Sequence, residues 1–280
     1  MKGTLKPMPS SALAFSKSAS AGTPVIFLHG LLRNRDCFAP LFPALAARQA
    51  IYLVDHAGHG ASPRLDSYRV VDHLPGLSEF LRRELDGEPA VLYGHSMGAM
   101  LAAALGAEYP ELVCAVVLED PPFHTMGERI AGTPLLGFFQ ALQPFVGMHA
   151  SWQELAAVRV PVAGNAESLP LGQVRDLTQV RFMARCFAET DPRVLDTVVE
   201  GSWLDGYDPN RVFSELRCPA LLLQADPVAG GMLTDEDAAG CARLAADLSV
   251  VRLPGVGHQA HWQDAPAVTR HFFAFLESLR

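Results

Sequence analysis

Residues 90–98 read AVLYGHSMG, and the fold is decided by this stretch. Its apolar start, Ala90–Tyr93, predicts a buried strand, and the Ala-, Leu- and Met-rich run Met97–Glu108 predicts a helix that ends before Pro110. A Gly-x-Ser-x-Gly pattern between a strand and a helix is typical of a tight turn that exposes the serine. The two glycines let neighbouring backbone approach without a clashing Cβ. Ser96 is therefore the candidate nucleophile.

Short apolar runs alternate with helical patterns on both sides of this turn. The predicted strands are Val25–Leu28, Ile51–Val54, Ala90–Tyr93, Val113–Glu119, Ala220–Ala225 and Leu248–Leu253. Such alternation predicts an α/β fold with a doubly wound, mostly parallel sheet. It breaks between residues 122 and 217, where apolar helical stretches occur without a strong strand. We therefore expect a core made of residues 1–121 and 218–280, and an inserted helical cap, residues 122–217.

The composition narrows the classes of partner. Of the 280 residues, 49% are hydrophobic and 19% charged, which indicates a large folded core. The formal net charge of −8 disfavours binding to nucleic acid or to an anionic lipid surface. No run of ~18–20 apolar residues could span a bilayer, and Lys2 and Lys6 precede no apolar run of the kind a secretory leader needs. We therefore expect a cytoplasmic protein that binds neither membrane nor nucleic acid.

Metal sites and disulfides are not expected. The five cysteines are odd in number and form no C-x-x-C pair, which favours reduced thiols over a disulfide framework or a structural zinc site. No H-x-x-x-H spacing stands out among the ten histidines. The sequence thus predicts no metal and no cofactor.

A serine hydroxyl needs a base, and His258 is the best candidate. It lies between the last predicted strand and the final helix, and it follows Ser96 in the chain as triads of this kind require. The oxyanion of an acyl-transfer reaction needs two N–H donors. We expect them to be the N–H groups of Met97, directly after the nucleophile, and of Leu31, directly after His29-Gly30.

Four blocks carry a resemblance to a known family. They are His29-Gly30, the loop at residues 55–62, the turn at residues 94–98, and Gly257-His258. Together, in this order, they resemble the capped branch of the α/β-hydrolase superfamily over nearly the whole chain. The resemblance implies a mostly parallel sheet, a cap between the sixth and seventh strands, and no cofactor. It does not fix the substrate, because this fold supports many reactions.

The carboxylate that orients His258 stays open between two positions. The resemblance places such an acid either at the end of the sixth strand or a few residues beyond the seventh. Asp120 fits the first position and is preferred. Asp226 follows the strand Ala220–Ala225 but stands two or three residues early, so it is the alternative, and Glu119 comes third.

These residues predict a serine-dependent carboxylesterase or lactonase acting through an acyl-enzyme. A serine at the turn excludes the dehalogenases and epoxide hydrolases of this fold, which use an aspartate there. The substrate pocket is expected to be lined by cap residues, namely Phe123, His124, Phe138 and Trp152. Since the early cap has no cluster of Arg or Lys, we expect a hydrophobic substrate of small to medium size. The protein is expected to be a monomer or a homodimer.

Other activities fit the same residues. A carbon–carbon bond hydrolase or a lyase of this fold would keep Ser96 and His258, and an amide or carbamate hydrolase would look much the same. A non-catalytic receptor for a small ligand is a possibility from a different class. Turnover of a generic ester distinguishes an enzyme from a receptor.

Overall fold

The computed structural model describes residues 12–20 and 22–279, and within those ranges its main sheet has seven strands. The strands are β1 (Phe15–Lys17), β2 (Pro24–Leu28), β3 (Ala50–Val54), β4 (Ala90–His95), β5 (Val113–Glu119), β8 (Ala220–Ala225) and β9 (Leu248–Leu253). Their order in the sheet is β1-β3-β2-β4-β5-β8-β9. Only β1 runs antiparallel to its neighbour, and the other pairs are parallel. The predicted α/β class with a mostly parallel sheet is confirmed.

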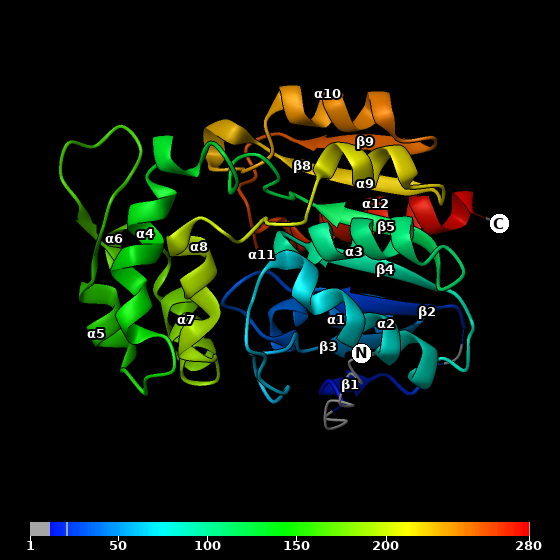
Figure 1. Ribbon diagram of the computed structural model, residues 1–280, viewed down its shortest axis with the longest axis horizontal. Helices are drawn as coiled ribbons and strands as arrows, with labels where there is room; N and C mark the ends of the chain where they lie inside the picture. The colour runs from blue at the N-terminus through cyan, green and yellow to red at the C-terminus, as the bar shows by residue number, and fades with distance from the viewer. Residues whose placement is uncertain (1–11, 21, 280) are drawn as a thin grey trace, which may run out of the picture.

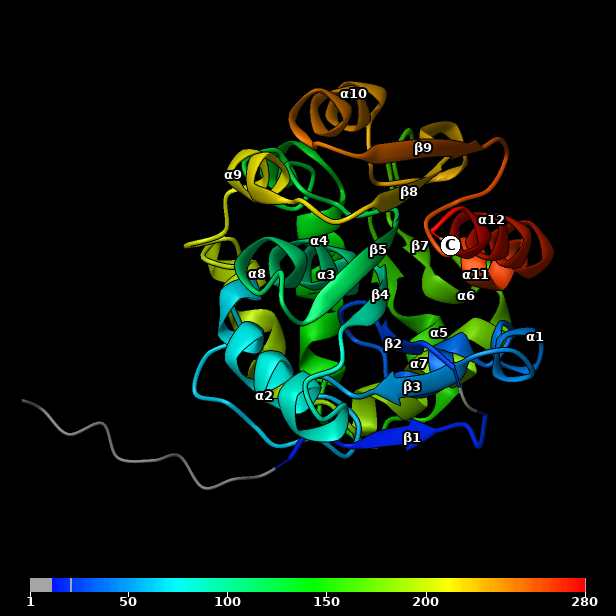
Figure 2. The same cartoon turned by 90° about the vertical axis from the view of Figure 1, so that its right-hand side faces the viewer.

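Helices cover both faces of this sheet, as Figure 2 shows. On one face lie α2 (Leu74–Glu84), α3 (Met97–Glu108), α9 (Pro209–Glu215) and α10 (Asp235–Leu244). On the other lie α1 (Phe42–Ala46), α11 (Ala260–Gln263) and α12 (Ala265–Ser278). Single 3-10 turns lie at Arg35–Phe38, Val70–His73, Ile130–Gly132, Gln143–Phe145, Pro192–Leu195 and Pro227–Ala229.

Strand side chains alternate between two apolar cores. On β2, Ile26 and Leu28 belong to the core beneath α2 and α3, whereas Val25 and Phe27 belong to the core beneath α1 and α12. All four residues are fully or almost fully buried. Burial on both faces explains why these strands read as continuous apolar runs in the sequence.

The inserted segment forms a separate lobe, seen at the left of Figure 1. It consists of α4 (Leu135–Leu142), α5 (Trp152–Ala157), α6 (Leu171–Val174), α7 (Leu177–Ala188), α8 (Asp196–Glu200) and a hairpin of β6 (Arg159–Val160) and β7 (Leu169–Pro170). Each of the longer helices buries one apolar stripe, for example through Leu142 on α4 and Val180 on α7. The segment is helical, as expected.

Two expectations about this insertion need correction. Helix α9 lies inside the expected cap range, but it packs against α3 and α10 over the sheet, because its Val212 and Phe213 are buried there (Figure 1). The cap lobe therefore ends before α9. Within the described residues, the insertion separates β5 and β8, which are the fifth and sixth strands of the main sheet in chain order rather than the sixth and seventh.

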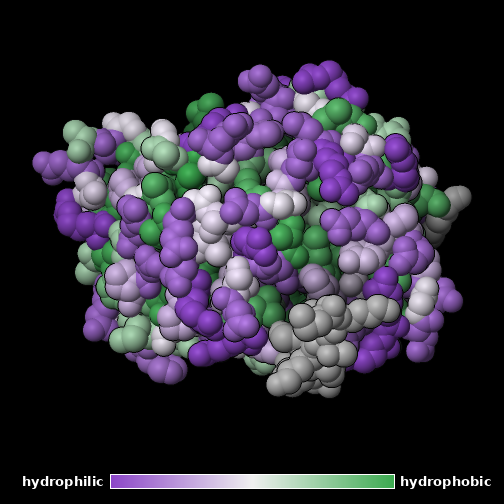
Figure 3. Space-filling model, viewed as in Figure 1, coloured by the Kyte–Doolittle hydropathy of each residue, from purple (hydrophilic) through white to green (hydrophobic). Residues whose placement is uncertain are grey.

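Other expectations concern the surface and the cysteines. None of the helices in the described part of the chain is long and apolar enough to cross a membrane. Figure 3 shows hydrophilic residues over much of one face, with apolar residues in scattered groups between them. All five cysteines are free thiols. Lys2 and Lys6, which bear on the expectation of no secretory leader, lie outside the described residues.

Candidate active site

The turn between β4 and α3 places Ser96 in an unusual backbone conformation. Its φ is 55° and its ψ is −119°, a region that non-glycine residues rarely adopt. A Cβ on Gly98 would lie 1.9 Å from the carbonyl oxygen of Leu28, and a Cβ on Gly94 would lie 2.1 Å from the carbonyl oxygen of Gly98. Glycine is therefore required at both positions by close backbone approach. The Ser96 N–H donates to the Glu119 carbonyl oxygen at 2.9 Å, which ties the turn to β5.

Ser96, His258 and Asp120 form a continuous series of hydrogen bonds. The His258 Nε2 lies 3.0 Å from Ser96 Oγ, and His258 Nδ1 lies 2.7 Å from Asp120 Oδ2. We assign the imidazole proton to Nδ1, because a carboxylate can only accept a hydrogen bond. Nε2 is then free to accept the proton of Ser96.

Asp120 is held in place from several sides. It is fully buried at the end of β5 with a φ of 43°, and its carboxylate accepts from the backbone N–H of Met232 at 2.8 Å and of Leu233 at 3.2 Å. These two residues lie beyond β8, so the carboxylate joins the ends of two neighbouring strands. Of the two aspartates left open by the sequence, Asp120 is the one within hydrogen-bond distance of His258.

Asp226 has a different set of partners. Its carboxylate accepts from the backbone N–H of Val228 at 2.9 Å and of Gly255 at 2.8 Å. These backbone hydrogen bonds lower the pKa of Asp226. Its carboxylate therefore caps the 3-10 turn after β8 and fastens that turn to the loop after β9. The alternative acid is not bonded to His258.

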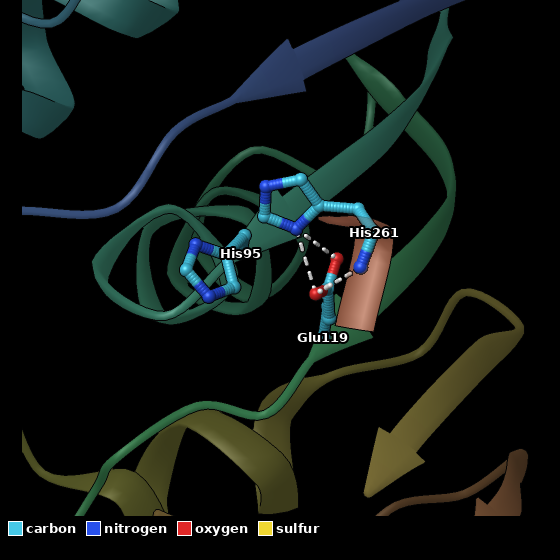
Figure 4. Close-up of side chains that lie close together, drawn as sticks. All are labelled: His95, Glu119 and His261. Atoms are coloured by element: carbon cyan, nitrogen blue, oxygen red, sulfur yellow. Dashed lines mark hydrogen bonds and ion pairs between the residues drawn. The ribbon is translucent and has the colours of Figure 1, made fainter. Parts of the chain in front are cut away.

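Glu119 belongs to a buried network next to the turn that contains Ser96, and Figure 4 shows Glu119 with His95 and His261. Its Oε1 accepts from the backbone N–H of His261 at 3.0 Å and from His261 Nδ1 at 2.8 Å, and Tyr93 OH donates to its Oε2. Burial alone would raise the pKa of Glu119, but His261 and the hydrogen-bond donors outweigh it and lower the pKa to about 2. Glu119 is thus an ionised structural carboxylate, and its partner is His261 rather than His258.

His95, which directly precedes Ser96 in the Gly-x-Ser-x-Gly turn, connects this network to the loop that contains His258. Its Nε2 lies 2.8 Å from the carbonyl oxygen of His258, and the two imidazole rings are 4.7 Å apart. The ligand-type atoms of His95, Glu119 and His261 lie within 4.8 Å of one another. The Glu119 oxygens accept from His261 and Tyr93, and the contact of His95 Nε2 fixes the backbone of His258. His95 Nδ1 is buried without a hydrogen-bond partner among the described residues.

A group of buried histidines shapes the loop that contains Leu31. His29 Nδ1 donates to the carbonyl oxygen of Gly30 at 2.8 Å, and the Leu32 N–H donates to His59 Nε2 at 3.3 Å. Burial lowers the pKa of His59 to about 4, which keeps the ring neutral and able to accept. These hydrogen bonds fix the backbone of the loop, and Leu31 lines the cavity beside Ser96. Met97, the other expected oxyanion donor, is fully buried as the first residue of α3.

A cavity of about 300 Å³ opens beside Ser96 and His258. It lies between the loops at the carboxyl ends of the strands and the cap. Its apolar wall includes Met126, Leu135, Phe138, Phe139, Leu142 and Trp203. Of the four expected pocket residues, Phe138 lines the cavity.

The other three expected pocket residues lie elsewhere. Phe123 is buried and packs edge-on against Phe213, with ring centroids 5.3 Å apart. His124 lines a separate hollow between the cap and α10. Trp152 lies on α5 with the guanidinium carbon of Arg181 3.9 Å from its ring centroid. The prediction for these three was wrong because the packing of the cap turns them away from Ser96.

Sequence reasoning missed the polar residues of the cavity. Arg33, Arg175, Gln259 and Gln263 all line it, and none of the lining residues in the described part of the chain is an aspartate or glutamate. Arg33 stands only two residues after Leu31, and this closeness in the sequence to an expected oxyanion donor could have predicted that Arg33 lines the cavity. Arg175 lies late in the cap, beyond the early segment where a basic cluster was sought. The cavity is therefore less uniformly apolar than expected.

Comparisons with known proteins agree with this architecture. The chain matches the family described as alpha/beta hydrolase fold over residues 23–155. The solved structure of an enol-lactonase from Burkholderia xenovorans LB400 superposes with a TM-score of 0.70 at 18% identity, covering 95% of this chain and 96% of the other. The chain therefore has the alpha/beta hydrolase fold.

Two further relatives of this α/β-hydrolase fold protein cover most of its length. The 2-(acetamidomethylene)succinate hydrolase of Mesorhizobium japonicum is 24% identical over 262 residues, which are 90% of this chain and 87% of the relative. A structure titled marine microorganism esterase has a TM-score of 0.72 at 22% identity, covering 95% of this chain and all (100%) of the other. These relatives cover 90% and 95% of the chain, so the similarity includes most of the cap.

Proposed function

We propose that the protein hydrolyses a carboxylic ester or lactone through an acyl-enzyme formed on Ser96. The observation that carries the proposal is the Ser96–His258–Asp120 series, with contacts of 3.0 Å and 2.7 Å beside a cavity. A serine hydroxyl becomes nucleophilic when an oriented imidazole can take its proton. Asp120 orients that imidazole and stabilises its protonated form.

The proposed reaction has two halves. His258 Nε2 takes the proton as Ser96 Oγ attacks the substrate carbonyl, and the oxyanion is bound by the N–H groups of Leu31 and Met97. His258 then protonates the leaving alcohol, and the acyl-enzyme remains. Water repeats the sequence with His258 as base, which releases the acid and restores Ser96.

The cavity and the relatives support an acyl substrate of moderate size. A volume of about 300 Å³ with an aromatic and aliphatic wall suits a small to medium hydrophobic portion. Two structural neighbours are titled an enol-lactonase and an esterase, which favours an ester-type bond. An amide is the second candidate, because the Mesorhizobium japonicum relative is named for an acetamido compound.

The test is hydrolysis of p-nitrophenyl esters of increasing acyl length by the wild type, Ser96→Ala and Ser249→Ala. Ser249 is an exposed residue on β9 and serves as the matched control. We expect turnover with an optimum chain length, a loss of at least about 10³-fold in Ser96→Ala, and no change in Ser249→Ala. A folded wild type that cleaves no ester of any length would contradict the proposal and favour a carbon–carbon hydrolase, a lyase or a receptor.

A further inference from the structure

Two arginines face the candidate cavity without a carboxylate partner. Most arginine contacts elsewhere are ordinary ion pairs, such as Arg35 with Asp55 and Arg69 with Asp72. Arg33 and Arg175 form no ion pair with any described residue, although both line the cavity beside Ser96. Unpaired guanidinium groups at one cavity are unexpected in a chain with a net charge of −8.

Arg33 is held in place by neutral acceptors only. Its Nη1 donates to the Leu32 carbonyl oxygen at 3.0 Å. When the Gln259 amide is oriented with its oxygen toward Arg33, that oxygen accepts from Nη2 at 2.9 Å and from Nε at 3.2 Å. The side chain is half-buried, and burial lowers the pKa of its guanidinium. Its orientation is therefore fixed, but its charge is not neutralised by a carboxylate.

Arg175 approaches the same space from the cap. It follows α6, and its guanidinium carbon lies 6.0 Å from the ring centroid of Phe138, another wall residue. Much of its surface is exposed, yet the surrounding protein lowers its pKa, and the positive charge of Arg33 lowers it further. The two guanidinium groups therefore repel one another across the cavity.

A cation in a partly enclosed site is costly unless an anion compensates it. Guanidinium groups bind carboxylate and phosphate through two parallel N–H···O bonds, which fixes both position and orientation. An arriving anion would relieve the repulsion between Arg33 and Arg175 and also gain these hydrogen bonds. The apolar wall that includes Phe138 would meanwhile hold the uncharged part of the same molecule.

We propose that Arg33 and Arg175 form a binding site for an oxyanion of the substrate, a carboxylate or a phosphate, located apart from the scissile carbonyl. The proposal deepens the proposed function, because it assigns an anionic substrate class to the site that contains Ser96. It differs from the expectation of a hydrophobic substrate of small to medium size, because under this proposal the substrate has an apolar portion and a negative charge.

The experiment measures binding without turnover, so its outcome does not depend on which bond the enzyme cleaves. Ser96→Ala protein is titrated calorimetrically with hexanoate, hexanamide and hexylphosphonate, which have six carbons each and differ in the head group. The same titrations are made with Arg33→Gln and Arg175→Gln added to Ser96→Ala. Arg181→Gln is the control, because Arg181 lies over Trp152 outside the cavity. Melting curves check that each variant folds.

We expect an anionic probe to bind at least about tenfold more tightly than hexanamide, and each cavity substitution to reduce that preference at least about fivefold. Arg181→Gln should leave the preference unchanged. Tighter binding of hexanoate identifies a carboxylate as the oxyanion, and tighter binding of hexylphosphonate identifies a phosphate. Equal binding of all three probes overturns the proposal, as does a preference that survives in both Arg33→Gln and Arg175→Gln. In the latter case the anion occupies the oxyanion site beside Ser96. Because Arg175 is exposed, its variant keeps the test valid even where Arg33→Gln disturbs the neighbouring loop.

Discussion

Replacement of Asp120 by Asn tests the reasoning about the catalytic series most directly. Three N–H donors converge on this carboxylate, from His258 Nδ1, Met232 and Leu233. An Asn side chain has one oxygen and one NH2 group, so at least one of those donors loses its acceptor. The negative charge beside the imidazole is lost whichever way the amide turns.

The rate effect follows from that charge. With charge centres ~4 Å apart and an effective dielectric constant of ~20, a carboxylate stabilises the imidazolium by about 4 kcal/mol. Each ~1.4 kcal/mol is a factor of ten in rate, so Asp120→Asn should lower kcat about a thousandfold. The unmatched donor should also reduce the free energy of unfolding by about 1–3 kcal/mol.

The assay is steady-state hydrolysis of the preferred p-nitrophenyl ester, with urea unfolding of each variant. Asp226→Asn is the matched control: its oxygen can still accept from a backbone N–H in the turn after β8, and kcat should stay within about threefold of wild type. The reasoning is refuted if Asp120→Asn retains activity within tenfold of wild type while Asp226→Asn loses it.

Three further predictions concern stability and the cavity. Burial lowers the pKa of His59 to about 4 and of His73 to about 3, whereas the unfolded values lie near ~6.5. Both rings are neutral in the native state, so their contribution to the free energy of unfolding is fully present above pH ~6.5 and is lost as the pH falls toward 4. Between pH 7.5 and pH 5 the two histidines together should lower the free energy of unfolding by about 4 kcal/mol. Equal urea midpoints at those two pH values would contradict this prediction. Gly98→Ala should reduce the free energy of unfolding by ~3 kcal/mol or more, because its Cβ would lie 1.9 Å from a main-chain oxygen; a variant with wild-type stability in urea would show the approach is not tight. Phe138→Ala should lower kcat/KM about tenfold for the preferred ester, while Trp152→Ala changes it less than twofold. A larger loss in Trp152→Ala than in Phe138→Ala would show that Phe138 does not contact the substrate.

Much of the sheet and the catalytic turn could be predicted because local chemistry determines them. The buried parallel strands are continuous apolar runs, and the Gly-x-Ser-x-Gly turn needs glycines wherever the backbones approach closely. The position of His258 followed from its place between the last strand and the last helix. These features depend on residues close together in the sequence.

The acid and the pocket depended on long-range packing, which spacing does not specify. Asp120 and Asp226 both follow strands, and only the three-dimensional arrangement shows that Asp226 is bound to Gly255 while Asp120 faces His258. The aromatic residues of the cap could not be sorted for the same reason, since the side of each helix that meets the core is set by neighbouring helices. Phe138 and Trp152 look alike in the sequence and lie in different environments.

The position of α9 shows how the cap is inserted into the connection between β5 and β8. β5 and β8 are adjacent parallel strands, and α9 lies over the sheet between them in chain order. Strand, helix and strand already make a complete crossover unit without the five cap helices. The cap is thus a long insertion in one connection, and among the described residues no strand of the main sheet pairs with a strand of the cap. Residues of the cap therefore supply much of the cavity wall, while Ser96, Asp120 and His258 follow strands of the main sheet.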